Sequence, residues 1–577
     1  KPLESYFFDD STRSRQSFAW RVNLERNDVA IIEVDTALNG FQNDYPFLQN
    51  NVGSAMLGNM GGASVPLDFF LRPQYSDFTF AQAFDAYLMT PERARFFNVK
   101  KPFTHLSYFM SGATQHLEEG LWVTHAQNVS PSTGFNLDYK SRGTRGQYEW
   151  QGAREKNLSL AFSHTGKKYS VHAGYIYNMG NLKENGGILR DRDITDTVFE
   201  RPELLDVRLN DARNLFKNNT FYVVQSYGVP LRQLTDEDFS IARNSTIFFG
   251  YSFLYSRFYK RYTDTKAESG DFYENWYVSP ERSYMENSLS NRLFVQIQPW
   301  DRDGAVGVIN AGIGNDAHHY YQFRLQDYMG SNEGANRNST YVYGSIEGNV
   351  KRYLDWNADV KFHLFGYRRQ DLSVGGDVAF KVYVRGRPMT LKGSLRHEIR
   401  TPGYWTESYF SNHFVWSNSF SKESETRFSV TFSAPQIGLE LGGYQSLLGD
   451  RIYYGADQLP AQYGGTVTVS GLYAQKDFRF GGLHLNHRVL YQYSSAEEVV
   501  PVPAISAYLS YYFEFNVVKN VLRLQLGLDG RYNTSYYAFG YNPATAQFYN
   551  QREKKLGNYP MIDVFAAATS TAGIPAL

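Results

Sequence analysis

The chain has 577 residues, no cysteine, equal numbers of acidic and basic side chains, and 16% aromatic residues. The lack of cysteine excludes disulfides and thiolate metal sites, and the balanced charge argues against nucleic acid as a partner, because nucleic-acid binding requires a basic surface. No run of about 18 apolar residues is present, which excludes a transmembrane helix.

The first 103 residues alternate poorly between apolar and polar side chains. Residues 18–34 are the exception, because they predict a hairpin that turns at Arg26, Asn27 and Asp28. We therefore expect residues 1–103 to form an N-terminal segment distinct from the rest of the chain.

Beyond residue 103 the dominant pattern is period-two alternation, in which Leu522, Leu524 and Leu526 are separated by Arg523 and Gln525. Successive side chains of a strand point to opposite faces, so each such segment has one apolar and one polar face. The same pattern recurs at residues 135–139, 158–162, 169–177, 293–297, 356–364, 372–384, 428–432 and 483–493.

Residues 178–219 break this alternation and are too long for a turn. Leu205, Leu209, Ala212 and Leu215 are spaced as one face of a helix, and Pro202 suits a first helical turn. We expect a long extracellular loop that contains a helix. If the alternating strands close into a barrel, this helix either constricts its pore as a lid or caps the rim of the barrel by burying its apolar stripe.

Three features favour a membrane barrel over a secreted all-β protein. The segments reach about 10 residues, as tilted membrane strands do; aromatic residues gather at their ends, as in residues 248–255; and the polar faces carry charges of both signs. The sequence therefore predicts an all-β fold, a transmembrane antiparallel β-barrel of about 16–20 strands within residues 104–577. Residues 1–103 are then a periplasmic or lumen-filling, plug-like segment.

Short joins at residues 367–371 and 386–388 predict tight turns, which we expect on the periplasmic side. The predicted location is the cell outer membrane, with any export signal already removed.

Charged residues on the polar faces are the candidate lumen-lining positions. They are Asp359, Lys361, Asp371, Asp377, Lys381, Arg385, Lys392, Arg396, Glu398, Arg523 and Asp529. Such residues either form a selectivity surface along a water-filled pore or pair into salt bridges that block the lumen. The sequence leaves both interpretations open.

No catalytic, nucleotide-binding or metal-binding motif is present. His318 and His319 form the only adjacent histidine pair, and no third ligand lies nearby in the sequence. We expect no enzyme activity and no cofactor. An outer-membrane hydrolase with a Ser–His–carboxylate cluster at the rim is the least favoured alternative.

Motifs near both ends of the chain carry a family resemblance. They comprise residues 34–42, 45–46, 57–61, 70–73, 97–104, 185–188, 452–454, 459–462, 476–478, 491–495, 526–529, 541–545 and 559–565. In this order they resemble the large putative-porin family of Bacteroidota outer membranes over about residues 30–565. The resemblance implies an outer-membrane β-barrel.

Besides the hydrolase, two functions remain open for such a barrel. The first is a porin for passive diffusion of small solutes. The second is a structural subunit of a multi-protein outer-membrane machine for barrel assembly or type 9 secretion. The expected partners are outer-membrane lipid and lipopolysaccharide and, for the second function, other outer-membrane proteins or lipoproteins.

The C-terminal residues depart from the pattern of a closing strand. After Phe565 the chain neither alternates nor ends in an aromatic residue, although a barrel cannot leave a bare strand edge in lipid. We expect the sequence to be incomplete or uncertain there, or the strand edge to be covered.

Overall fold

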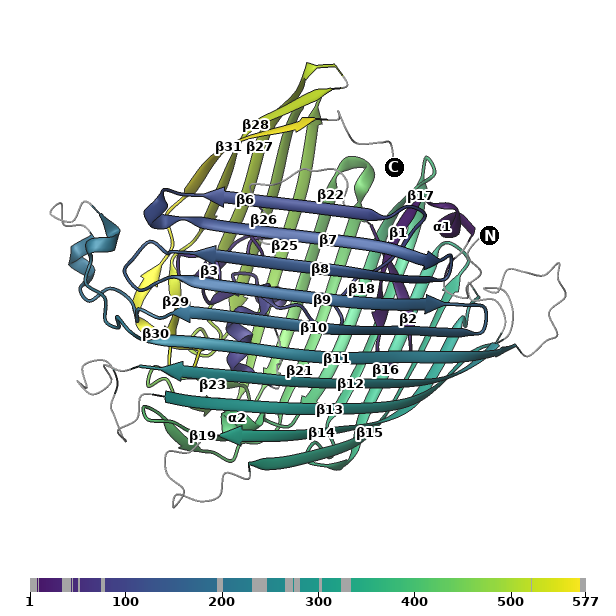
Figure 1. The fold of residues 1–577 in the computed structure, drawn as a ribbon, viewed down its shortest axis with the longest axis horizontal. Helices are drawn as coiled ribbons and strands as arrows, with labels where there is room; N and C mark the ends of the chain where they lie inside the picture. Colours follow the sequence, from purple (N-terminus) through teal and green to yellow (C-terminus); the bar gives the residue numbers. More distant parts are fainter. Residues whose placement is uncertain are drawn as a thin grey trace.

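The computed structural model describes residues 8, 10–33, 43, 45–49, 52–73, 78–194, 201–230, 246–264, 273, 281–299, 304–322, 334–519 and 521–570. Figure 1 shows neighbouring strands lying side by side in sequence order, and twenty of them form a closed antiparallel barrel. This confirms the predicted fold class, with the strand number at the upper end of the predicted range.

The barrel strands have the following bounds: β6 (Phe103–Ser111), β7 (Glu118–Ser130), β8 (Thr133–Thr144), β9 (Ala153–Thr165), β10 (Tyr169–Lys183), β11 (Arg213–Pro230), β12 (Thr246–Thr263), β13 (Glu281–Gln298), β14 (Val308–Gln322), β15 (Ala335–Val350), β16 (Leu354–Gly366), β17 (Leu372–Val384), β18 (Arg387–Arg400), β21 (Glu423–Ala434), β22 (Leu439–Gly449), β25 (Thr466–Phe480), β26 (Leu483–Ser494), β27 (Ile505–Val518), β28 (Leu522–Asn533) and β31 (Met561–Ser570). Short elements interrupt the joins: η4 (Thr114–His116), η5 (Asp191–Ile194), η6 (Pro202–Leu204), α2 (Tyr404–Glu407), β19 (Ser408–Phe410), β20 (Val415–Ser417), η10 (Pro435–Ile437), β23 (Ile452–Tyr454), β24 (Pro460–Gln462), β29 (Tyr536–Asn542) and β30 (Gln547–Leu556).

The alternation of the sequence becomes an apolar outer face and a polar inner face. On β17, Val374, Phe380 and Val382 point outward and are 42%, 54% and 63% exposed, whereas Asp377 and Lys381 line the interior. So much exposed apolar surface is unfavourable in water. It is typical of the outer face of a barrel that contacts lipid. None of the described helices is long and apolar enough to cross a membrane.

The two ends of the barrel differ in the length of their joins. Residues 385–386 connect β17 to β18 at one end, which we call the short-turn end, and residues 184–212 connect β10 to β11 at the other, the long-loop end. Because consecutive strands are antiparallel, the joins that flank β17 lie at opposite ends of the barrel. The expectation that residues 367–371 and 386–388 share one side is therefore wrong, and residues 367–371 belong to the long-loop end.

The long join is shorter than the sequence indicated, and its predicted helix is not formed. Strand β10 continues to Lys183 and β11 begins at Arg213, so Leu215 lies on a strand. Of residues 201–212, only Pro202–Leu204 form one 3₁₀ turn. Leu205, Leu209 and Ala212 are nevertheless buried. The helical spacing of these apolar residues therefore comes from their burial in an irregular loop and not from one face of a helix.

The closing strand extends beyond the point where the sequence pattern ends. Strand β31 pairs with β28 from Met561↔Arg531 to Ser570↔Leu522, and Ala566 lies opposite Leu526. Residues 566–570 thus belong to a strand, because backbone hydrogen bonds to β28 hold small residues that lack a strong strand preference. Residues 571–577 lie outside the described residues.

The described residues between 8 and 99, called the plug from here on, form a separate body. It contains α1 (Asp10–Ser14), β1 (Ser17–Asn23), β2 (Asp28–Ile32), β3 (Ser54–Met56), β4 (Ser64–Pro66), η2 (Phe69–Leu71), η3 (Thr79–Tyr87) and β5 (Phe96–Val99). The predicted hairpin is confirmed, since β1 pairs with β2. Asn27 in its turn has a φ of 53°, a left-handed conformation that asparagine tolerates better than most residues.

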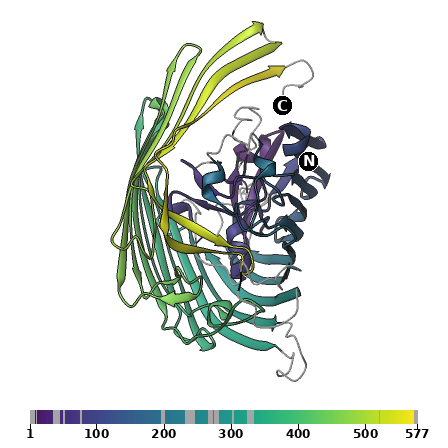
Figure 2. The same cartoon turned by 90° about the vertical axis from the view of Figure 1, so that its left-hand side faces the viewer.

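The plug contacts the inner wall on opposite sides of the barrel. The indole N–H of Trp20 donates to His172 of β10 at 3.1 Å, and the backbone N–H of Phe69 donates to Gln492 of β26 at 2.9 Å. Toward the long-loop end, Phe80 packs against Trp405 of α2 with ring centroids 5.1 Å apart. Figure 2 shows the N-terminal strands lying between the two walls. The plug therefore fills the centre of the lumen, and open space lies between the plug and the wall.

Candidate functional site

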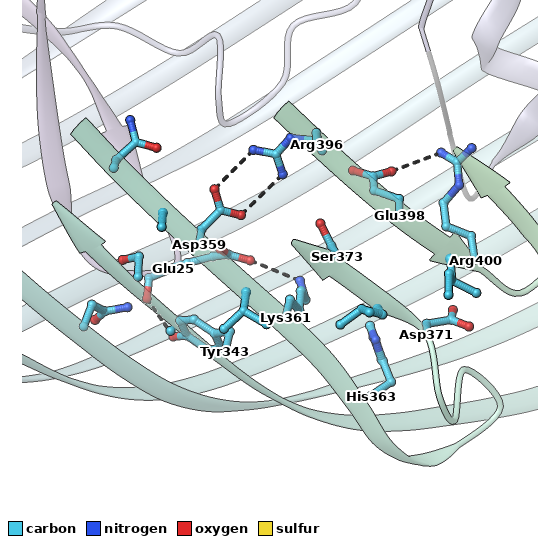
Figure 3. Close-up of a pocket in the computed structure, with 18 of the residues that line it drawn as sticks. Glu25, Tyr343, Asp359, Lys361, His363, Asp371, Ser373, Arg396, Glu398 and Arg400 are labelled. Atoms are coloured by element: carbon cyan, nitrogen blue, oxygen red, sulfur yellow. Dashed lines mark hydrogen bonds and ion pairs between the residues drawn. The ribbon is translucent and has the colours of Figure 1, made fainter. Parts of the chain in front are cut away.

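Two neighbouring cavities lie along the wall formed by β15 to β18. The first has a volume of about 570 Å³ and lies between this wall and the tip of the plug hairpin, at Glu25 and Arg26 (Figure 3). The second, of about 500 Å³, continues toward the short-turn end. Asn357 and Asp377 line both cavities. Because they share these two residues, we treat them as one path along the wall and call it the wall channel.

The strand register explains why the wall channel is charged. Alternate positions on β16, β17 and β18 point inward, and polar residues occupy most of them. Asp359 pairs in register with Gly375, which pairs in turn with Arg396. The Arg396 guanidinium reaches across Gly375 to the Asp359 carboxylate at 3.2 Å. A Cβ on Gly375 would lie 2.8 Å from that guanidinium and 3.0 Å from the carboxylate, so any larger residue there would push the two ends of this ion pair aside.

Further ion pairs repeat along the path. They are Lys422–Asp371 at 2.7 Å, Lys361–Glu25 at 3.1 Å, Lys392–Asp377 at 3.5 Å, Arg400–Glu398 at 3.6 Å and Lys381–Asp355. Several of these side chains stay partly open to the cavities: Arg396 is 45% and Lys392 50% exposed. Exposed ion pairs contribute little to stability, but they present both signs of charge to anything inside the channel.

The predicted lumen residues fall into three groups. Those lining the first cavity are Asp359, Lys361, Asp371, Asp377, Arg396 and Glu398, and Lys381 and Lys392 line the second. Arg523 and Asp529 lie on β28 instead, where Arg523 pairs with Glu514 at 3.4 Å and Asp529 accepts from Asn43 of the plug at 3.1 Å. Arg385 lies in the exposed two-residue turn that follows β17, with a φ of 51°, so it is outside the strand faces.

The tip of the plug hairpin is fastened to this wall. Tyr343 donates to the backbone carbonyl of Glu25 at 2.6 Å, and Arg26 contacts Glu347 at 3.2 Å. Burial alone would raise the pKa of Glu25, but the nearby Lys361 and Arg292 outweigh it and hold the pKa below its ordinary value. Glu25 is therefore ionised at neutral pH, and its contact with Lys361 is a charge pair.

Two tyrosines of β15 lie beside the first cavity, and each has a glycine of β14 opposite it. Tyr341 and Tyr343 pair across the sheet with Gly314 and Gly312 of β14. A Cβ at either glycine would lie within 2.4 Å of the opposite ring. The rings therefore lie flat over β14, and Tyr341 contacts the Lys361 ammonium with its ring centroid 4.3 Å away.

Sequence reasoning missed several lining residues. Asp355 continues the alternation of Asn357 and Asp359, so the pattern itself could have identified it. Glu25 and Arg26 come from the plug, and the sequence carries no sign of their approach to this wall. His363 also lines the first cavity, and both of its ring nitrogens lack a hydrogen-bond partner among the described residues.

Comparisons with solved structures support the fold. The siderophore receptor PirA from Acinetobacter baumannii superposes with a TM-score of 0.51 at 9% identity, covering 81% of this chain and 73% of that one. A mutant of the ferric enterobactin receptor PfeA from Pseudomonas aeruginosa gives 0.53 at 10% identity, with 81% and 72% covered. The copper transporter OprC gives 0.53 at 11% identity, with 81% and 71% covered. At these identities the likeness concerns the fold, that of outer-membrane receptor and transporter barrels.

No curated protein matches the chain. A family model described as "Putative porin" matches residues 16–570, nearly the whole chain, as the resemblance of its end motifs implied. An outer-membrane β-barrel with a plugged lumen and a charged path along one wall, this chain belongs to the putative porin family.

Proposed function

We propose that the protein lets small polar solutes diffuse passively across the outer membrane through the wall channel. The observation that carries this proposal is that the two cavities share Asn357 and Asp377 and extend along the inner faces of β16 to β18 beside the plug. A path along the wall allows conduction while the centre of the lumen stays filled.

The charges of the channel suggest which solutes pass. The first cavity is lined by five acidic residues, Glu25, Asp359, Asp371, Asp377 and Glu398, and five basic residues, Arg26, Lys361, Arg368, Arg396 and Arg400. Their sum is zero, so the lining does not favour one sign of ion. Uncharged and zwitterionic solutes can bind such a surface by hydrogen bonds without a net electrostatic barrier.

The outer face of the barrel and the lengths of its joins support a proposed orientation in the outer membrane. The outward apolar side chains, such as Val382 at 63% exposure, suit contact with outer-membrane lipid. We place the long-loop end outside the cell, against lipopolysaccharide, because long joins of such barrels are extracellular.

The test is the conductance of the intact protein in a planar lipid bilayer. We expect a small, stable current with little preference between potassium and chloride, and slow swelling of proteoliposomes in an isotonic sugar or amino-acid solution. An intact, correctly folded barrel that never conducts would contradict the proposal.

The filled lumen supports a second candidate, a structural subunit of an outer-membrane assembly. In that case the plug stiffens the barrel, and the long-loop or short-turn end contacts partner proteins. Copurification of stable partners in mild detergent would favour this candidate, whereas isolation as a single conducting species would count against it.

A further inference from the structure

The outward face of strands β9 to β12 carries cationic side chains toward the long-loop end. Arg154 and Lys156 occupy successive outward positions of β9, Lys217 lies on β11 and Arg257 on β12, and all four are exposed. Their strands lie side by side in the barrel wall (Figure 1). We call these four residues the outer basic band.

The strand register brings the members of the outer basic band close together. Lys156 pairs with Met179 of β10, which pairs in turn with Lys217. The two lysines are therefore two strand spacings, about 10 Å, apart. Arg257 pairs with Asn219, the next outward position after Lys217 on β11. One multivalent anion can thus reach several of these cations at once.

Acidic side chains are missing from the strand faces that bear the band. Strands β10, β11 and β12 contain no acidic residue, and the only one on β9, Glu155, is buried and contacts Arg142 inside the barrel. None of the four cations forms an ion pair within the described parts of the chain. Arg257 donates to the sulfur of Met285 at 3.1 Å, a weak acceptor. Their counter-charges must therefore come from outside the protein.

The band follows directly on a row of apolar and aromatic side chains. Leu160, Tyr175, Phe221 and Tyr255 pair in register across β9 to β12 and are 36–46% exposed. Such aromatic rows mark the level at which lipid hydrocarbon meets the headgroups. Strands β11 and β12 have 18 residues each, more than the roughly 9–11 that cross the hydrocarbon. The band, at the next outward positions toward the long-loop end, therefore lies at headgroup level.

We propose that the outer basic band binds the phosphate groups of lipopolysaccharide. Phosphate is a multiply charged oxyanion that lysine and arginine bind through charge-assisted hydrogen bonds. The acyl chains of the same lipid then contact the aromatic row next to the band. This inference rests on the orientation proposed above, with the long-loop end outside the cell, and not on conduction through the wall channel.

The test is native mass spectrometry of the purified full-length protein in a neutral detergent. Lipid A with two phosphates is the probe, and dephosphorylated lipid A is the matched lipid that lacks the anionic groups. We expect the phosphorylated form to bind at least about tenfold more tightly, since it can engage several cations. Lys156→Gln and Lys217→Gln should each weaken its binding about fivefold, the contribution of one basic residue beside an anionic headgroup.

Arg387→Gln is the matched control, because Arg387 is exposed at the start of β18, at the short-turn end. It should leave lipid A binding unchanged, and heat-dependent migration on gels verifies that each variant is folded. Equal binding of the two forms of lipid A, or unchanged binding in both lysine variants, would overturn the proposal.

Phosphatidylglycerol is the competing lipid in the same measurement. Tighter binding of this phospholipid than of lipid A, weakened by the same lysine variants, would assign the band to phospholipid headgroups and would also overturn the proposal. Because the measurement needs no membrane current, its outcome is independent of whether the wall channel conducts.

Discussion

Deleting residues 1–99 should raise the single-channel conductance at least about tenfold, because barrels of 16–18 strands already leave an open aqueous channel when nothing fills them. The present barrel has twenty strands, and the plug fills its centre. The deletion removes every plug residue but retains Phe103, where β6 begins. Planar-bilayer recording of the refolded variant measures the change.

A milder variant distinguishes a wide pore from a damaged barrel. Arg26→Gln removes the contact with Glu347 and loosens only the hairpin tip. We expect it to raise conductance less than the deletion does and to increase current noise. If the deletion variant folds, as judged by circular dichroism and heat-dependent gel migration, yet conducts no more than the intact protein, then the plug is not what restricts the lumen.

The second large effect concerns ion selectivity. Arg396→Glu changes the charge of the first cavity from zero to minus two. A change of two charges about 6 Å from a monovalent ion in water alters its energy by about 1–2 kcal/mol, which changes its local concentration roughly five- to thirtyfold. The channel should become clearly cation-selective. Reversal potentials in a potassium chloride gradient measure this shift.

The same reversal at Arg385 is the matched control. Arg385 lies on the same hairpin, but in the exposed turn after β17 and outside both cavities. We expect Arg385→Glu to leave the reversal potential nearly unchanged. Equal shifts in the two variants would mean that selectivity arises at the mouth of the barrel and not in the wall channel.

The barrel itself could be predicted because its cause is local. Alternation such as that of Val374, Phe380 and Val382 with Asp377 and Lys381 fixes both the strand and the face that meets lipid. The structure of the loop at residues 184–212 could not be predicted, because apolar residues at helical spacing can also be buried in an irregular loop. The end of β31 was missed for a similar reason: pairing with β28 holds residues 566–570 in a strand that their own composition does not favour.

The site was predictable only in part. The inward positions of β16, β17 and β18 followed from the alternation, and eight of the eleven predicted residues line the wall channel. The alternation did not predict which charged residues form ion pairs. Asp359 and Arg396, for example, lie on strands separated by β17 and meet across Gly375. The contact of Glu25 with the barrel wall depends on how the plug folds inside the barrel. The sequence of the plug alternates poorly between apolar and polar residues, so no local pattern predicts this contact.

The most direct test of conduction along the wall uses the absence of cysteine from this chain. Asp377 lines both cavities, whereas its neighbour Val378 points outward and is 40% exposed. A charged, membrane-impermeant thiol reagent should sharply reduce the current of Asp377→Cys from either side of the bilayer, and should leave Val378→Cys and the unmodified protein unaffected. A conducting Asp377→Cys variant whose thiol reacts without any change in current would show that solutes do not pass through the wall channel.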